Sequence, residues 1–197
     1  GSKLLCEHFG FRYVEHANKP LGVKMNAAAQ LAGEWKPDYC VMLGSDDIIG
    51  ESLFALYLQK FRKNVDYVYT TDFYFYDTLS KKTLYWAGYN EDRNRNHACG
   101  AGRCLSRRVM EELEWQPWLA DRLHDLLDTS FDHRMKKVKH TKAAIKMGEH
   151  RAFAVDIKSA TNMTPFRHWP NTVVVDNSYM EMGLGNELAK EVFKCVE

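Results

Sequence analysis

The chain has 197 residues, enough for one domain with a sizeable hydrophobic core. Its 27 Lys and Arg residues nearly balance its 26 Asp and Glu residues, which argues against a dedicated nucleic-acid-binding protein. Its five cysteines are odd in number and none has CxxC spacing, so we expect reduced thiols in a cytoplasmic protein rather than disulfides or a zinc site. No apolar run approaches transmembrane length.

The first part of the chain predicts a helix end, a strand and a helix. Residues 3–9 have the apolar spacing of a helix end, and Gly10 closes it. Because a domain seldom begins in the last turns of a helix, we expect further sequence upstream. Residues 11–16 alternate as a strand does, and residues 23–35 predict a helix whose alanines pack on a sheet.

Residues 39–47 are the central stretch. Apolar residues 39–43 predict a strand buried on both faces, which is typical of parallel sheets. Asp46 and Asp47 are then expected just past its carboxyl end, the edge at which open α/β sheets bind ligands. Two adjacent carboxylates there favour a divalent cation, Mn²⁺ or Mg²⁺. The alternative is that they cap the following helix.

The rest of the chain continues the α/β pattern. The further strands are expected at 66–76, 83–89, 152–157 and 172–175, with a hairpin turn at 77–82. The further helices are expected at 51–62, 107–113 (capped by Ser106), 119–127, 128–138 and 184–196. Basic residues over 134–146 favour a solvated helix face, with phosphate or acceptor binding second. We therefore predict one α/β domain over 1–197, with a mixed, mostly parallel sheet flanked by helices.

Four stretches, in the same order along 11–169, resemble family 2 glycosyltransferases with the GT-A fold. Asn18, Gly22 and Asn26 are similar to the family's "N-x-G…N-x-G/A" segment. Residues 43–48 (LGSDDI) resemble its "L-D-x-D-D" form of the DXD motif, and residues 100–107 its small-residue segment on the acceptor side. Residues 127–134 resemble its "E-D-x-D-L-x-x-R" segment, with Asp128 on the catalytic aspartate and Arg134 on the arginine.

The resemblance implies a Rossmann-like nucleotide-diphospho-sugar transferase fold that lacks its first strand. It implies inverting, metal-dependent transfer of a sugar to an acceptor hydroxyl on a glycan, a lipid-linked glycan, a protein or a modified nucleic acid. Asp128 would be the general base, and Asp46, Asp47 and His168 would bind Mn²⁺ or Mg²⁺. The remaining donor-binding residues implied are Asn18, Gly22, Asn26, Ser45, Arg103 and Arg134.

Two positions depart from the family pattern. Gly44 stands where the first aspartate of the DXD motif belongs, and Leu127 replaces the glutamate before the catalytic aspartate. Both departures favour a second hypothesis, a non-catalytic sugar-nucleotide or glycan-binding domain of the same fold. A sugar-phosphate nucleotidyltransferase is a third. For Asp128 the alternative role is a helix N-cap, and for His168 and Arg103 it is a structural one.

Overall fold

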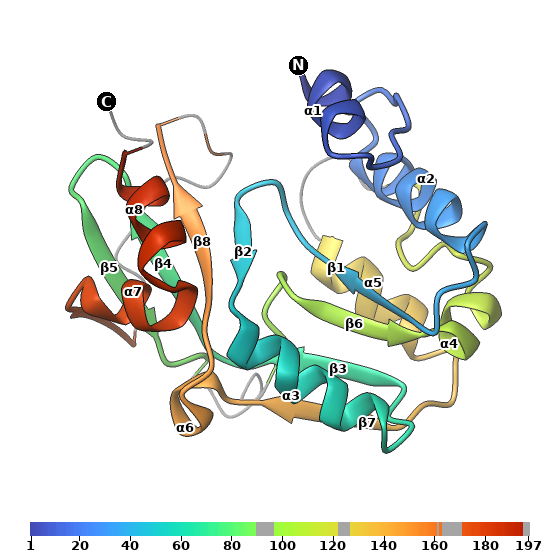
Figure 1. Ribbon diagram of the computed structural model, residues 1–197. Helices are drawn as coiled ribbons and strands as arrows, with labels where there is room; N and C mark the ends of the chain where they lie inside the picture. The colour runs from blue at the N-terminus through green and yellow to red at the C-terminus, as the bar shows by residue number, and fades with distance from the viewer. Residues whose placement is uncertain (90–96, 122–126, 161, 163–170, 195–197) are drawn as a thin grey trace. The chain divides into compact units, whose positions relative to one another are not determined.

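The computed structural model describes residues 1–89, 97–121, 127–160, 162 and 171–194 (Figure 1). The chain forms two compact units, which are described separately below. Unit 1 combines Gly1–Cys40 with Ser106–His140, and unit 2 combines Val41–Leu105 with Thr141–Glu197. The expectation of one catalytic domain over 1–197 stays a prediction.

Unit 1 is helical. Its helices are α1 (Ser2–His8), α2 (Leu21–Gly33), α4 (Arg107–Glu112) and α5 (Leu127–Met135). The first strand, β1 (Tyr39–Met42), crosses from unit 1 into unit 2. No strand forms over residues 11–16, so that prediction is wrong: their side chains are exposed and bury no face.

Unit 2 contains most of the strands. They are β2 (Asp47–Ile49), β3 (Tyr67–Thr70), β4 (Phe73–Asp77), β5 (Lys82–Trp86), β6 (Arg103–Ser106, its last residue in unit 1), β7 (Lys142–Ile145), β8 (Ala154–Lys158) and β9 (Thr172–Val175). Its helices are α3 (Glu51–Phe61), α6 (Met147–His150), α7 (Ser178–Leu184) and α8 (Asn186–Lys194). Within this unit α7 and α8 lie over β4, β5 and β8 (Figure 1), and the Tyr76 and Phe193 rings meet there with centroids 5.4 Å apart.

The strands form two sheets, ordered β1-β6-β3-β7 and β2-β8-β4-β5-β9. Antiparallel pairing joins β2 to β8, β3 to β6, β4 to β5, and β5 to β9. Parallel pairing joins β3 to β7 and β4 to β8. The α/β composition is therefore confirmed, but the mostly parallel, Rossmann-like sheet is wrong. It was predicted because β2, β6 and β7 were not recognised as strands, and these short strands change the pairing.

The single strand predicted over 66–76 is two strands in two different sheets. Residues Thr71 and Asp72 separate β3 from β4, although no glycine or proline marks a break. The buried Asp72 carboxylate accepts hydrogen bonds from the Met147 and Gly148 backbone N–H groups (2.6 and 2.8 Å). The Tyr85 hydroxyl donates a third at 2.7 Å. The bend is thus held by contacts with residues distant in sequence.

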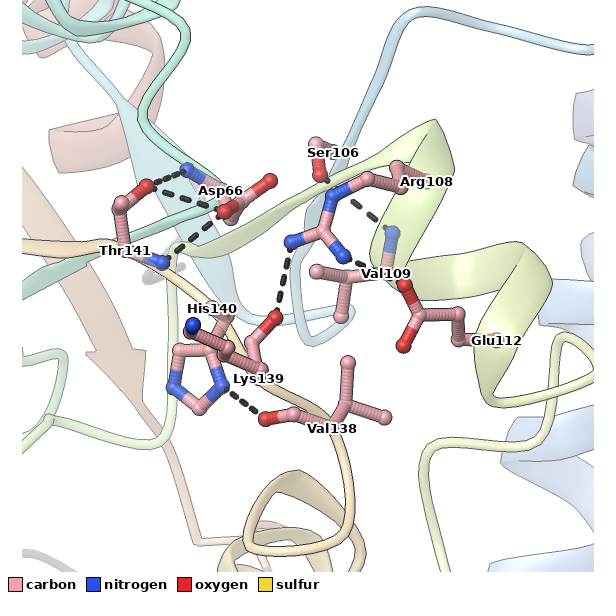
Figure 2. Close-up of polar contacts among 9 residues, drawn as sticks. All are labelled: Asp66, Ser106, Arg108, Val109, Glu112, Val138, Lys139, His140 and Thr141. Carbon is pink, nitrogen blue, oxygen red and sulfur yellow. Dashed lines mark hydrogen bonds and ion pairs between the residues drawn. The ribbon is translucent and has the colours of Figure 1, made fainter.

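Polar contacts fix the chain where it passes from unit 1 to unit 2 (Figure 2). In unit 1, Arg108 pairs with Glu112 and donates to the Lys139 carbonyl at 3.0 Å. In unit 2, the Asp66 carboxylate accepts from the Thr141 backbone N–H and hydroxyl at 2.9 and 3.0 Å. The second set aligns β3 with β7, so part of the basic stretch 134–146 is a strand and not a helix face.

Two other predictions are settled by these elements. The hairpin is confirmed, since β4 and β5 pair in register from Phe73 opposite Trp86 to Asp77 opposite Lys82. The strand at 39–43 exists as β1, but it is an edge strand and only half-buried.

Most of the predicted helix 119–127 lies outside the described residues. Among the described residues, no helix is both long and apolar enough to cross a membrane.

Candidate metal centre

Three carboxylates meet where β2 pairs with β8 in unit 2. The chain leaves β1 at Met42 and turns through Gly44–Asp46, so that Asp47 begins β2. In the antiparallel register Asp47 lies directly opposite Asp156. Side chains of such a pair share one face of the sheet, and like charges placed opposite each other are destabilising. The sequence therefore forms this cluster at a cost in stability that a bound cation would remove.

The cluster consists of Asp46, Asp47 and Asp156, each offering an oxygen within 4.8 Å of the others. The buried Lys158 ammonium lies 2.5 Å from Asp156 Oδ2 and 4.0 Å from Asp46 Oδ2. The Asn162 side-chain amide donates to Asp46 Oδ2 at 2.6 Å. One ammonium opposite three carboxylates leaves two formal negative charges when all are ionised.

Gly44 lies directly beneath two of these carboxylates. Its backbone N–H donates to Asp47 Oδ2 at 2.6 Å. A Cβ at this position would meet Asp46 Oδ1 at 2.7 Å and Asp47 Oδ2 at 2.8 Å, closer than real contacts allow. A side chain at position 44, including the aspartate of the family motif, would therefore displace the other two.

The environment favours the neutral form of two of the acids. Burial raises the pKa of Asp156 to about 6, opposed by Lys158 and reinforced by the charges of Asp46 and Asp47. Burial likewise raises the pKa of Asp47, against the hydrogen bond from Gly44. A nearby positive charge would lower both pKa values, because it stabilises the carboxylate form.

These residues fit a hard divalent cation. Carboxylate oxygens are the ligands preferred by Mg²⁺ and Mn²⁺. Asp156 Oδ1 is buried and has no hydrogen-bond partner within the described part of the chain, which leaves it available as a ligand. The helix-cap alternative for Asp46 and Asp47 is wrong, because α3 begins after Gly50 and no side chain caps it.

The other predicted site residues of unit 2 have different surroundings. Ser45 is exposed in the turn next to Asp46. Arg103 is buried and donates to the Cys99 and Ala98 carbonyls at 3.0 and 3.5 Å, so part of its guanidinium has a structural role. His168 lies outside the described residues.

Five predicted site residues belong to unit 1, whereas the cluster belongs to unit 2. Asn18 is exposed, and Gly22 is buried with its Cα facing the Leu119 carbonyl. Asn26 is buried and exchanges two hydrogen bonds with the Trp118 backbone. Arg134 donates to the Gln116 and Leu113 carbonyls at 2.9 and 2.8 Å. Asp128 is exposed in the first turn of α5.

Sequence reasoning did not single out Asp156, Lys158 or Asn162 as individual residues of a metal site. The signal was present, because Asp156 and Lys158 alternate with apolar residues along β8 and so share one face. Only the register of β8 against β2 brings that face to Asp47. Comparisons with protein-family models, with curated proteins and with solved structures found no match.

Proposed function

We propose that the protein is a metal-dependent glycosyltransferase that moves a sugar from a nucleotide-diphospho-sugar to an acceptor hydroxyl. The observation that carries the proposal is the convergence of Asp46 and Asp47, from the DXD-like stretch, with Asp156 in one cluster. The order of the four sequence stretches also supports the proposal. The sheet topology does not support it.

The residues of the cluster have separate roles in this proposal. Asp46, Asp47 and Asp156 would hold Mn²⁺ or Mg²⁺, and the bound cation would offset the negative charge developing on the leaving diphosphate. Lys158 keeps Asp156 in place through their 2.5 Å ion pair. Asn162 fixes Asp46, since its amide oxygen also accepts from the Ser159 backbone N–H at 2.7 Å.

Asp128 is proposed as the general base that removes the acceptor proton. It is exposed, as a group that must reach an acceptor has to be. Loss of general base catalysis costs roughly 10²–10⁴-fold in rate. Asp128→Asn should therefore lower transfer by about that factor while donor binding survives. Asp132, one turn further along α5, provides the matched control Asp132→Asn, which should transfer normally.

The proposal is tested by incubating the chain with a panel of nucleotide-diphospho-sugars and measuring nucleoside diphosphate release. Release that requires Mn²⁺ or Mg²⁺, stops with EDTA and stops in Asp46→Ala would support a transferase. Metal-dependent donor binding without release or transfer, with any acceptor class, would instead indicate the non-catalytic binding domain. Pyrophosphate exchange with a nucleoside triphosphate would indicate the nucleotidyltransferase.

A further inference from the structure

A cavity of about 480 Å³ lies on unit 2, away from the carboxylate cluster. Its described lining comes from β4, from the stretch around α6 and from α7: Tyr74, Gly148, Arg151, Ala152, Phe153, Tyr179, Met182 and Gly183. This volume lies within the usual range of roughly 300–1,000 Å³ for small-molecule sites.

The cavity and the cluster lie on opposite faces of the five-stranded sheet. Tyr74 is in register with Val155, and Phe75 with Asp156, so Tyr74 and Asp156 point to opposite faces. The Tyr74 ring contacts Phe153 and Tyr179, with centroids 4.5 and 6.3 Å away. The Lys158 ammonium instead lies over the Phe75 ring. A ligand in the cavity would therefore not belong to the proposed donor site.

The walls of the cavity combine aromatic rings with one positive charge. Tyr74 and Phe153 are buried, whereas Tyr179 and Met182 are 42% and 70% exposed. Aromatic rings of this kind offer a stacking surface to a flat ligand. Gly183 is required here, since a Cβ at that position would run into the Phe153 ring at 2.1 Å.

Arg151 is the only charged residue in the described lining. It is exposed, and within the described residues its guanidinium makes no ion pair or hydrogen bond with a side chain. Its neighbour Glu149 pairs with Lys146 at 3.2 Å instead. A planar guanidinium that is always charged is suited to a carboxylate or a phosphate, which it can bind through two parallel hydrogen bonds.

We propose that this cavity binds a small anion that carries a flat ring, with the ring against Tyr179 and the anionic group on Arg151. Nucleoside monophosphates and aromatic carboxylates share this chemistry. The site goes beyond the proposed transfer reaction, because it lies on the other face of the sheet and needs no metal.

The test is isothermal titration of the full chain in EDTA with four probes: adenosine 5′-monophosphate, benzoate, adenosine and ribose 5-phosphate. Adenosine 5′-monophosphate or benzoate, or both, should bind more tightly than adenosine, which has no charge, and than ribose 5-phosphate, which has no aromatic ring. The tighter of the two anions shows whether the site prefers a nucleoside monophosphate or an aromatic carboxylate. Arg151→Asn should weaken that binding roughly tenfold or more. Asparagine suits the left-handed backbone at φ +52°, so this variant should fold.

Two further variants make the result decisive. Tyr179→Leu removes the stacking surface and should weaken binding roughly tenfold. Arg62→Ala removes another exposed arginine of the same unit and should leave binding unchanged. The proposal is overturned if neither ring anion binds at millimolar concentration. It is also overturned if Arg151→Asn and Tyr179→Leu bind the probe as tightly as the natural chain.

Discussion

The carboxylate cluster of Asp46, Asp47 and Asp156 places three acids beside one lysine, Lys158, in a partly buried environment. Buried charges destabilise a fold unless they are paired, and Asp156 has Lys158 on one oxygen and no described partner on the other. The adjacent pair Asp46 and Asp47 could be predicted from sequence as a candidate site. Asp156 could not be predicted, because its role depends on strand register. The contact of Gly44 with the Asp46 and Asp47 carboxylates could not be predicted either.

Because the pKa of Asp156 is raised, the stability of the fold should decrease as the pH rises. Its folded-state pKa of about 6 exceeds its ordinary 3.8, so the folded chain holds this proton more tightly than the unfolded chain. The stabilising contribution is full below pH 3.8 and is lost as the pH rises through about 6. Replacing Asp156 with Asn removes this dependence. The measurement is urea unfolding without metal. As the pH is raised from acidic to neutral, the free energy of unfolding of the variant should increase by about 1–2 kcal/mol relative to that of the natural chain, after allowance for solvent screening.

The control for this experiment is Glu181→Gln, which alters an exposed carboxylate of the same unit. A difference between Asp156→Asn and the natural chain that does not change with pH would contradict the assigned environment of Asp156. So would a change in the opposite direction.

At the element scale, the errors of sequence reasoning share a cause. The hairpin β4–β5 was predictable because its turn residues are local. The division of 66–76 into β3 and β4 was not, because Asp72 is held by backbone N–H groups near residue 147. Likewise β7 lies within the basic stretch 134–146 and becomes a strand through its pairing with β3. Long-range pairing decided these elements, and it overrode local pattern.

Asp72 should therefore be a determinant of stability, although it is not placed in either site. Asp72→Ala leaves the Met147 and Gly148 N–H groups without their acceptor and should destabilise the fold by about 2–4 kcal/mol. Tyr85→Phe removes only the third hydrogen bond and should cost about 1 kcal/mol. Denaturant unfolding monitored by circular dichroism measures both. Equal effects of the two variants would show that the backbone contacts of Asp72 are not what holds the bend.

At the scale of the whole molecule, each unit is assembled from two separate stretches of chain. Composition correctly indicated an α/β protein, but nothing local in the sequence marks the boundaries after Cys40, Leu105 and His140. In unit 1 the two stretches are joined by buried Asn26, whose amide donates to the Trp118 carbonyl at 2.9 Å and accepts from its N–H at 3.1 Å. This residue was predicted to bind the donor, and here it has both side-chain groups engaged with backbone.

Asn26→Ala should accordingly destabilise unit 1. It leaves one buried donor and one buried acceptor of Trp118 unpaired, for an expected loss of about 2–4 kcal/mol. The neighbouring control Lys24→Ala changes an exposed side chain of α2 and should stay within about 0.5 kcal/mol. Thermal unfolding of both variants provides the comparison. If Asn26→Ala melts like the natural chain, the two stretches are joined by other contacts.

Mn²⁺ binding measured by electron paramagnetic resonance tests whether Asp46, Asp47 and Asp156 form a site for a divalent cation. We expect one Mn²⁺ bound per chain at neutral pH, with affinity at least roughly tenfold lower in Asp46→Ala and in Asp156→Asn. The exposed-carboxylate variant Asp176→Asn should bind Mn²⁺ like the natural chain. Failure of the natural chain to bind Mn²⁺ at millimolar concentration, or binding by the Asp46 and Asp156 variants as tight as that of the natural chain, would show that these carboxylates do not form a cation site.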